Sequence, residues 1–422
     1  MTNSKLKTQN STLMITQDVP IDRRIVLQAR TLTDAGWNVT ILARAAADAT
    51  AALNLRDRVE EWVDGIRVQR IKVEGQDPRY GWVYRLGRVA GARGQRAGVA
   101  TSALLGVLNG YNTFSRLAPH YAAAMKADVY HAHDLNNLQS AALAALINDS
   151  RLVYDAHELF PEINNRWVRL KKRYWTKVER RLLPKCDAAS TVNEFIADEM
   201  ASRYHVPPPT VIYNATNPPS GFDAANPPNH LREALGLGRE TRIALFQGWM
   251  AEGRGLENLV LAAKHLPANI VIIMLGFGDY RSKLEQMART AGLTERVLFL
   301  DAVPQDKLVE YCASADVGLI PYQAVDLNNF YSSPNKLFDY IVAGLPIIAN
   351  DLPFLRKMVV GHGLGLTAEL HDAQSYASAI SLLLGNERLL RETRANLLAA
   401  AKVYNWDEEG KKVVAMYERM RT

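Results

Sequence analysis

SSPNKLFDYIVAGLP, residues 332–346, predicts one complete helix that leads into a buried strand. Ser333 is expected to cap the helix and Pro334 to be its first residue, because serine is a favoured cap and proline suits a first turn. Gly344 is expected to end the helix, and Pro346 prevents its continuation. The stretch therefore predicts a short helix with defined ends.

The first turn of this helix contains residues suited to an anion. Asn335 and Lys336 lie where free backbone N–H groups and the helix dipole favour negative charge. Asp339 follows Lys336 by three residues, on the same face of the helix. This arrangement suits a nucleotide, with phosphate at the helix end and ribose hydroxyls below it. An ordinary surface helix with a charged pair is the alternative, and spacing alone leaves both open.

Strands and helices alternate on both sides of a Pro- and Asn-rich linker, residues 214–229. Such alternation predicts mostly parallel sheets, which bind ligands at the carboxyl ends of their strands. The predicted fold class is α/β, with two doubly wound (Rossmann-like) domains. The expected strands are 12–16, 37–43, 65–73, 128–131, 152–155, 187–192 and 210–213 before the linker, and 243–247, 270–275, 297–300, 317–320 and 346–349 after it.

Loops after the strands of the second half are suited to a diphosphate. Gly248 and Gly276 each follow a strand, and glycine allows a close approach of the backbone. Arg254 can donate two hydrogen bonds to a diphosphate. These loops and the 332–346 helix face one edge of the sheet, which makes them stronger evidence together than any one of them alone.

Charged and polar residues also follow the strands of the first half. The residues expected at this edge are Asp22, Arg24, His133, Asp134, Asp155, His157 and Glu158. His133 could bind a ligand, or it could bind a metal together with His131 and with Asp134 or His157. Both histidines could equally be structural. Asp22 could simply cap the helix that follows it.

Length and composition limit the class of protein. A chain of 422 residues is too long for one ordinary core. Its net charge of +6 favours phosphates or an anionic membrane as partners. The 2 cysteines indicate a reducing compartment, and neither a signal peptide nor a membrane span is predicted. Nucleic acid is not an expected partner, because no nucleic-acid-binding motif is recognised.

Two segments, residues 79–96 and 166–181, interleave cations with Trp and Tyr. This composition is typical of helices that lie on a membrane surface or bind an anionic acceptor. A solvated basic face whose aromatic residues belong to the core is the alternative. The predicted location is the cytoplasm. The two basic segments leave open a peripheral position on the inner face of the plasma membrane.

The ordered set of motifs resembles the GT-B glycosyltransferases, and is similar to their retaining family 4. The resemblance covers nearly the whole chain and includes HAHD at 131–134, YDAHEL at 154–159, QGWMAEGRG at 247–255 and PNKLFDY at 334–340. It implies two domains that face each other across a cleft. The expected domains are an acceptor-binding domain at 1–215, a donor domain at 216–403 and a C-terminal helix at 404–422 that packs on the first domain.

The resemblance also implies roles for particular residues. His133, Arg254 and Lys336 are the expected catalytic residues, with His133 contacting the donor sugar and the two cations its diphosphate. The expected donor-binding residues are Gly248, Arg254, Gly276, Val303, Ser333, Pro334, Asn335, Lys336 and Asp339. The sequence departs from the family pattern at Tyr331 and Trp249, which stand in place of a glutamate and an arginine, and at Asp339, which replaces a glutamate.

The implied reaction is transfer of a sugar from a UDP- or GDP-linked donor to a glycan or lipid-linked acceptor. Retention, without a metal or other cofactor, is expected, and Arg254 and Lys336 would stabilise charge on the leaving diphosphate. Inversion with Asp155, His157 or Glu158 as the base is the minority interpretation. A nucleotide-sugar epimerase, a non-catalytic sugar-nucleotide-binding partner and a metal hydrolase are the alternatives from other classes.

Overall fold

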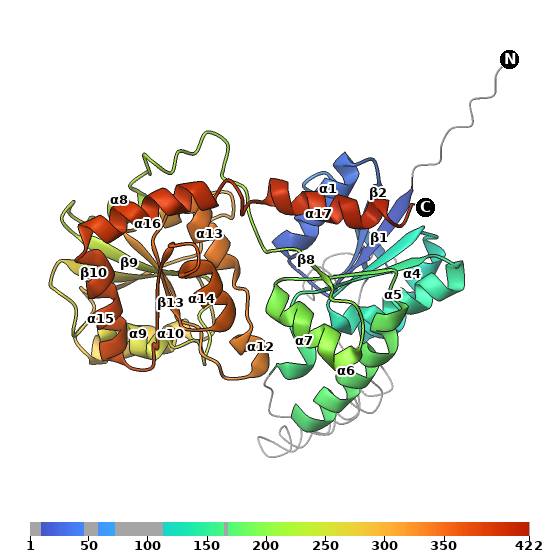
Figure 1. Cartoon of the computed structure of the whole chain (residues 1–422), viewed down its shortest axis with the longest axis horizontal. Coiled ribbons are helices and arrows are strands. Elements are labelled where there is room, and N and C mark those ends of the chain that lie inside the picture. Colours follow the sequence, from blue (N-terminus) through green and yellow to red (C-terminus); the bar gives the residue numbers. More distant parts are fainter. Residues whose placement is uncertain (1–9, 46–57, 72–112, 164–167, 422) are drawn as a thin grey trace. The chain divides into compact units, whose positions relative to one another are not determined.

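The computed structural model describes residues 10–45, 58–71, 113–163 and 168–421 (Figure 1). Its contacts divide the chain into two compact units, Met1–Ile212 with Gly410–Thr422, and Tyr213–Glu409. Each unit contains one sheet covered by helices. The expected boundary, after residue 215, falls three residues beyond the start of the second unit. The basic segment at 79–96 lies outside the described residues.

The sheet of the first unit has eight strands in the order β3-β4-β2-β1-β5-β6-β7-β8. All neighbouring strands are parallel except β3 and β4, which form an antiparallel edge that the sequence analysis did not predict. The strands are β1 (Ser11–Ile15), β2 (Asn38–Arg44), β3 (Arg58–Val63), β4 (Ile66–Ile71), β5 (Val129–His133), β6 (Arg151–Ala156), β7 (Ala188–Thr191) and β8 (Thr210–Val211).

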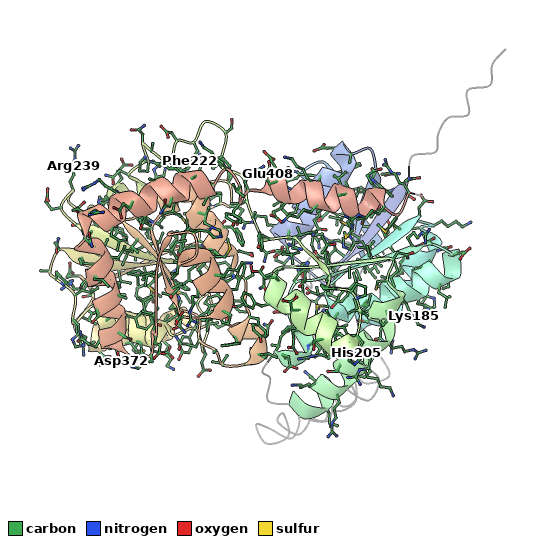
Figure 2. All side chains as sticks on the ribbon, viewed as in Figure 1. Lys185, His205, Phe222, Arg239, Asp372 and Glu408 are labelled. Carbon is green, nitrogen blue, oxygen red and sulfur yellow. The ribbon has the colours of Figure 1, made fainter. Side chains whose placement is uncertain are left out.

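The strand order of the first unit reverses between β1 and β5, which are neighbours. Loops at the carboxyl ends of two such strands diverge and leave room for a ligand. The helices of this unit are α1 (Arg23–Asp34), α4 (Thr113–Ala124), α5 (Leu135–Asn148), α6 (Val168–Leu182) and α7 (Glu194–Tyr204). His205, labelled in Figure 2, ends α7 in a left-handed conformation.

The C-terminal helix α17 (Trp406–Glu418) brings Tyr417 into the core of the first unit. The Tyr417 hydroxyl lies 2.9 Å from Nδ1 of His131, which is fully buried. Its ring also packs edge-on against Trp37, with 5.0 Å between ring centroids. His131 is thereby part of the core, which agrees with the structural interpretation of this histidine.

The sheet of the second unit has six parallel strands in the order β11-β10-β9-β12-β13-β14. Its strands are β9 (Arg242–Gln247), β10 (Ile270–Leu275), β11 (Val297–Leu300), β12 (Val317–Ile320), β13 (Ile347–Asn350) and β14 (Gly365–Ala368). Here the order reverses between β9 and β12. The sequence analysis predicted the first five of these strands to within one residue, and it did not predict β14.

Two layers of helices cover this second sheet. One core cluster joins alternate residues of β9 and β10, such as Phe246 and Met274, to α9, α10 and α15. On another part of the unit, α13 packs against α11 and α16. The helices are α8 (His230–Leu235), α9 (Leu256–Ala262), α10 (Arg281–Thr290), α11 (Leu308–Ala313), α12 (Leu327–Phe330), α13 (Asn335–Ala343), α14 (Pro353–Val359), α15 (Ala373–Leu384) and α16 (Glu387–Ala400).

Helix α13 is the helix predicted from residues 332–346, with one correction at its start. It begins at Asn335, and Pro334 occupies the cap position in an extended conformation. The prediction that Ser333 caps the helix is wrong, because the serine hydroxyl makes no hydrogen bond. The helix ends at Gly344 in the left-handed conformation, as predicted. Among the described helices, none has the length and apolarity needed to cross a membrane.

We predict that Gly276→Ala destabilises the protein. Gly276 has a φ of 141°, and an added Cβ would lie 2.2 Å from the carbonyl oxygen of Gly248. Backbone strain and overpacking should together lower the free energy of unfolding by about 2–4 kcal/mol. Gly238→Ala is the matched control, because nothing lies within 4 Å of its added Cβ. Equal midpoints for the two variants in thermal unfolding would contradict this packing.

Candidate functional site

Two glycine loops meet at the carboxyl ends of β9 and β10. Gly248 follows β9 with a φ of 115°, and its N–H donates to the carbonyl oxygen of Leu275 at 2.9 Å. Gly276 packs directly on Gly248, at a separation that admits no side chain. An added Cβ on Gly248 would lie 3.7 Å from Nζ of Lys336. The glycines therefore bring the backbone close to the Lys336 ammonium group.

Lys336 and Arg254 converge on one tyrosine. Nη1 of Arg254 donates to the hydroxyl oxygen of Tyr322 at 2.6 Å, and Nζ of Lys336 donates to the same oxygen at 3.1 Å. Tyr322 follows β12, so the three side chains meet where the strand order of the sheet reverses. This is the position at which doubly wound sheets bind ligands.

The Lys336 ammonium group is buried, and no carboxylate of the described residues is in ion-pair contact with it. Its side chain is 4% exposed, and within the described residues neither Lys336 nor Arg254 forms an ion pair with a carboxylate. Burial lowers the pKa of Lys336, and Tyr322 and Asp339 oppose that shift. A buried cation without a counter-ion is costly. An anionic ligand would reduce that cost, which makes this a candidate anion site in the second unit.

The start of α13 adds further unsatisfied polar groups. Pro334 provides no side-chain hydrogen bond to the first turn. The hydroxyls of Ser332 and Ser333 are buried and make no hydrogen bond within the described residues. Asn335 is exposed at the first position of the helix. Free N–H groups and free hydroxyls at a helix N-terminus favour a bound anion.

Two further predicted donor-binding residues are Asp339, whose charge acts on Lys336, and Val303. Asp339 is 2% exposed, and its Oδ2 accepts a hydrogen bond from Nε2 of Gln247 at 3.0 Å. It sits one turn deeper in α13, as expected, and its contact with a ribose stays a prediction. Val303 is partly exposed in the loop after β11, two strands away from β9. Its role in binding the donor is likewise a prediction.

In the first unit, Asp155 is the centre of a buried network. Nε and Nη2 of Arg24 each donate to it at 2.8 Å, and Gln28 and Ser190 each donate at 2.7 Å. The carboxylate is fully buried and Arg24 is 4% exposed. Although burial alone would raise the pKa of Asp155, the Arg24 guanidinium holds it well below its usual range. Arg24 and Asp155 thus stabilise each other inside the unit, and acceptor binding by either stays a prediction.

His133 and His157 lie beside this carboxylate. Nε2 of His157 is 3.2 Å from Nδ1 of His133 and 3.3 Å from Asp155. Burial alone would lower the pKa of His157, but Asp134 and Asp155 raise it to about 10. Burial lowers the pKa of His133, whose Nδ1 also lies 3.5 Å from Oδ2 of Asp155. The other ring nitrogen of His133, Nε2, is buried without a partner in the described part of the chain.

His131, His133 and Asp155 together have the ligand atoms of a possible metal site. These atoms lie within 4.8 Å of one another. However, both carboxylate oxygens of Asp155 already bind the guanidinium of Arg24. A metal ion there would add a second cation next to a fixed one, at close range and in a buried environment. The residues fit a metal poorly, and the alternative of a metal hydrolase is disfavoured.

Asp134, Asp22 and Glu158 surround this network. Asp134 begins α5 with a φ of 65°, a strained conformation for a residue other than glycine, and burial raises its pKa. Its carboxylate lies 3.6 Å from His157. Asp22 caps α1 by accepting from the backbone N–H of Arg24 at 2.7 Å. Glu158 is partly exposed after β6. Asp22 thus has the capping role that the sequence analysis had left open.

Three residues that contribute to these two sites are not predicted from the sequence. Tyr322 was overlooked, although it stands two residues after a predicted strand, and that position was the available signal. Gln28 and Ser190 are separated from Asp155 by 127 and 35 residues, and no local pattern pairs them. Only the register of the parallel strands brings Ser190 opposite Asp155.

The raised pKa of His157 predicts a pH-dependent contribution to stability. The pKa is about 10 when folded and near 6.5 when unfolded. The protonated side chain therefore stabilises the fold below about pH 6.5, and this contribution is lost as the pH rises towards 10. We expect His157→Gln to be about 2–4 kcal/mol less stable than wild type at about pH 6. Denaturant unfolding at several pH values measures this difference, and a difference that does not shrink at alkaline pH would contradict it.

Comparison with known families covers most of the chain. The family model described as Glycosyltransferase Family 4 matches residues 21–218. A second model, described as Glycosyl transferases group 1, matches residues 229–403. The gap between the two matches, residues 219–228, lies within the Pro- and Asn-rich linker, so the first match covers all of the first sheet except β1 and the second covers the second sheet.

Among curated proteins, a D-inositol 3-phosphate glycosyltransferase of Xylanimonas cellulosilytica is 29% identical over 224 residues. That match covers 51% of this chain and 51% of the relative. A phosphatidyl-myo-inositol mannosyltransferase of Propionibacterium freudenreichii is 27% identical over 296 residues, 69% of this chain and 70% of the relative. The chain thus spans about half the length of the first of these relatives.

Among solved structures, sucrose-phosphate synthase from Thermosynechococcus elongatus has a TM-score of 0.70 at 18% identity, over 97% of this chain and 99% of that one. Anabaena HepE, solved in complex with UDP-glucose, has a TM-score of 0.69 at 16% identity over the same shares of the two chains. These similarities show the fold. The predicted two-domain GT-B architecture is therefore confirmed, and the chain belongs to the GT-B glycosyltransferases that resemble family 4.

Proposed function

We propose that this protein transfers a sugar from a nucleotide-diphosphate sugar to a glycan or lipid-linked acceptor. The observation that carries the proposal is the buried Lys336 ammonium group beside Arg254, with no carboxylate on either cation in the described residues. Such a site takes a ligand with negative charge. Anabaena HepE, a protein of similar fold, binds UDP-glucose. We propose a UDP- or GDP-linked sugar as the donor here.

In this proposal the leaving diphosphate gains charge during transfer, and Lys336, Arg254 and the N-terminus of α13 stabilise that charge. Gly248 lets the diphosphate approach the backbone. Asp339 holds the ribose, and Val303 lies near the base. His133 donates from its unpartnered Nε2 to a hydroxyl of the donor sugar. No metal or other cofactor has a role in this scheme.

We also propose retention of configuration at the anomeric carbon. An inverting enzyme needs a general base whose pKa is near the working pH. Asp155 is a poor base because hydrogen bonds and Arg24 lower its pKa. His157 is already protonated near neutral pH. Glu158 is the remaining predicted base. The anomeric configuration of the product, measured for wild type and for Glu158→Gln, decides between retention and inversion.

The acceptor proposal rests on helix α6. Its residues Arg173, Lys177 and Arg180 are exposed and spaced to share one face of the helix, and Leu170 on that face is 56% exposed. A basic face with an exposed apolar residue suits an anionic membrane surface. We propose that the protein binds the inner face of the plasma membrane through this helix, where a lipid-linked acceptor would be presented.

Product analysis distinguishes the alternatives from other classes. An epimerase would convert the nucleotide sugar without an acceptor, and a non-catalytic partner would bind it without turnover. The alternative of a non-catalytic partner is motivated by Tyr331, which stands where the family pattern has a glutamate. We expect a glycosylated acceptor and a free nucleoside diphosphate.

We predict that Lys336→Ala and Arg254→Ala each lower the rate of donor turnover by about 10²-fold or more, because each removes a cation that stabilises the leaving group. The measurement is release of nucleoside diphosphate from the preferred donor. Lys264→Ala and Arg388→Ala, which remove exposed cations elsewhere in the same unit, are the controls. Near-normal rates in both test variants would overturn the assignment of this site.

We further predict that the protein sediments with vesicles that contain an anionic lipid, and that salt releases it. Replacing Arg173, Lys177 and Arg180 together by Gln should reduce the bound fraction severalfold at low salt. The control replaces Arg388, Arg391 and Arg394 of α16 by Gln, which changes the net charge equally. Equal binding by the two triple variants would argue against α6 as the membrane-binding helix.

A further inference from the structure

The hydroxyl of Tyr322 is held between two cations in the second unit. Nη1 of Arg254 and Nζ of Lys336 both donate to its oxygen, at 2.6 and 3.1 Å. The same cations lie over its ring, with Cζ of Arg254 4.7 Å and Nζ of Lys336 4.4 Å from the centroid. Two positive groups are therefore fixed by both the oxygen and the π face of one side chain.

These contacts leave the Tyr322 hydroxyl able to donate one hydrogen bond. A phenolic oxygen can accept through its lone pairs and donate through its single hydrogen. Here both acceptor positions are used by charged donors. Within the described residues the O–H itself has no acceptor. The hydroxyl hydrogen is therefore available for a hydrogen bond to a ligand. Burial alone would raise the pKa of Tyr322, but Lys336 and Arg254 lower it, which makes the O–H a stronger donor.

Arg254 and Lys336 also have N–H groups that are not used by Tyr322 or Trp249. Arg254 uses Nη1 on Tyr322 and on the carbonyl oxygen of Trp249, which leaves Nε and Nη2 for a ligand. Lys336 uses one N–H on Tyr322 and keeps the others. The free donors of all three side chains lie at the point where β9 and β12 diverge.

We propose that Tyr322 donates its hydroxyl hydrogen to the diphosphate of the nucleotide sugar and also orients Lys336 and Arg254 around it. The inference rests on the proposed function, because it assigns a further binding residue to the same site. Tyr322 is then a specificity residue for the phosphate-bearing part of the donor. It has no role in recognising the nucleoside.

The test is binding of UDP and of uridine to wild type and to Tyr322→Phe, measured by calorimetry. Tyr322→Phe keeps the ring and removes only the hydroxyl. Loss of a hydrogen bond to a charged acceptor should weaken binding of UDP about ten- to a hundredfold, and leave uridine unaffected. Tyr404→Phe is the matched control, because it removes a phenolic hydroxyl bonded to His362 in the same unit.

A second readout follows the ionisation of Tyr322. The ultraviolet difference between wild type and Tyr322→Phe reports one phenol among the 17 tyrosines of the chain. The groups that face this phenol are Lys336 from α13 and Arg254 from the loop after β9. We expect it to ionise below the ordinary pH of tyrosine, and we expect bound UDP to raise its pKa because a phenolate cannot donate to the diphosphate.

Three outcomes separate this inference from the proposed function. Equal affinity of wild type and Tyr322→Phe for UDP, or an equal loss for UDP and uridine, would overturn the role of Tyr322 alone. Failure of wild type to bind any nucleoside diphosphate, with retained binding of inorganic pyrophosphate, would overturn the proposed donor, and pyrophosphate would then serve as the probe of Tyr322. Binding of neither ligand would overturn both.

Discussion

A buried ammonium group without a carboxylate partner is the constraint on which the second unit depends. Lys336 is held by a phenolic oxygen and by two aromatic faces, those of Tyr322 and Phe246, with Nζ 4.4 and 4.6 Å from their centroids. These contacts keep the cation in place at less cost than an unpaired charge in an apolar core. Asp339 also acts on this charge, but no carboxylate of the described residues forms an ion pair with it, so the ammonium group can still bind an anion from solution.

The first unit also contains a buried cation, but there the cation is paired with a carboxylate. There Arg24 is paired with Asp155, and Gln28 and Ser190 also donate hydrogen bonds to that carboxylate. This network has no charge left to offer a ligand, but it fixes the positions of His157 and His133. In the first unit, Nε2 of His133 is an unpartnered imidazole nitrogen, which suits a sugar hydroxyl, whereas the second unit offers cations, which suit a phosphate.

Much of the fold follows from local pattern. Gly344 and the apolar spacing of α13 predicted its end and its buried face, and the buried strands of the second unit were found because each is a short apolar run. The start of α13 was misplaced because a serine before a proline resembles a cap by composition. The pairing of Arg24 with Asp155 and the position of Tyr322 between two cations depend on strand order. A single sequence does not encode strand order locally, so neither contact was predicted.

The most direct measurement is thermal unfolding of the protein against a panel of UDP-, GDP-, ADP- and dTDP-sugars, without metal and then with magnesium. The account predicts a clear rise in the unfolding temperature with one nucleotide in the absence of metal, because a ligand that binds only the folded state stabilises it. It also predicts loss of that rise in Lys336→Ala. No shift with any nucleotide sugar would contradict the central claim that Lys336 and Arg254 of the second unit form a diphosphate site.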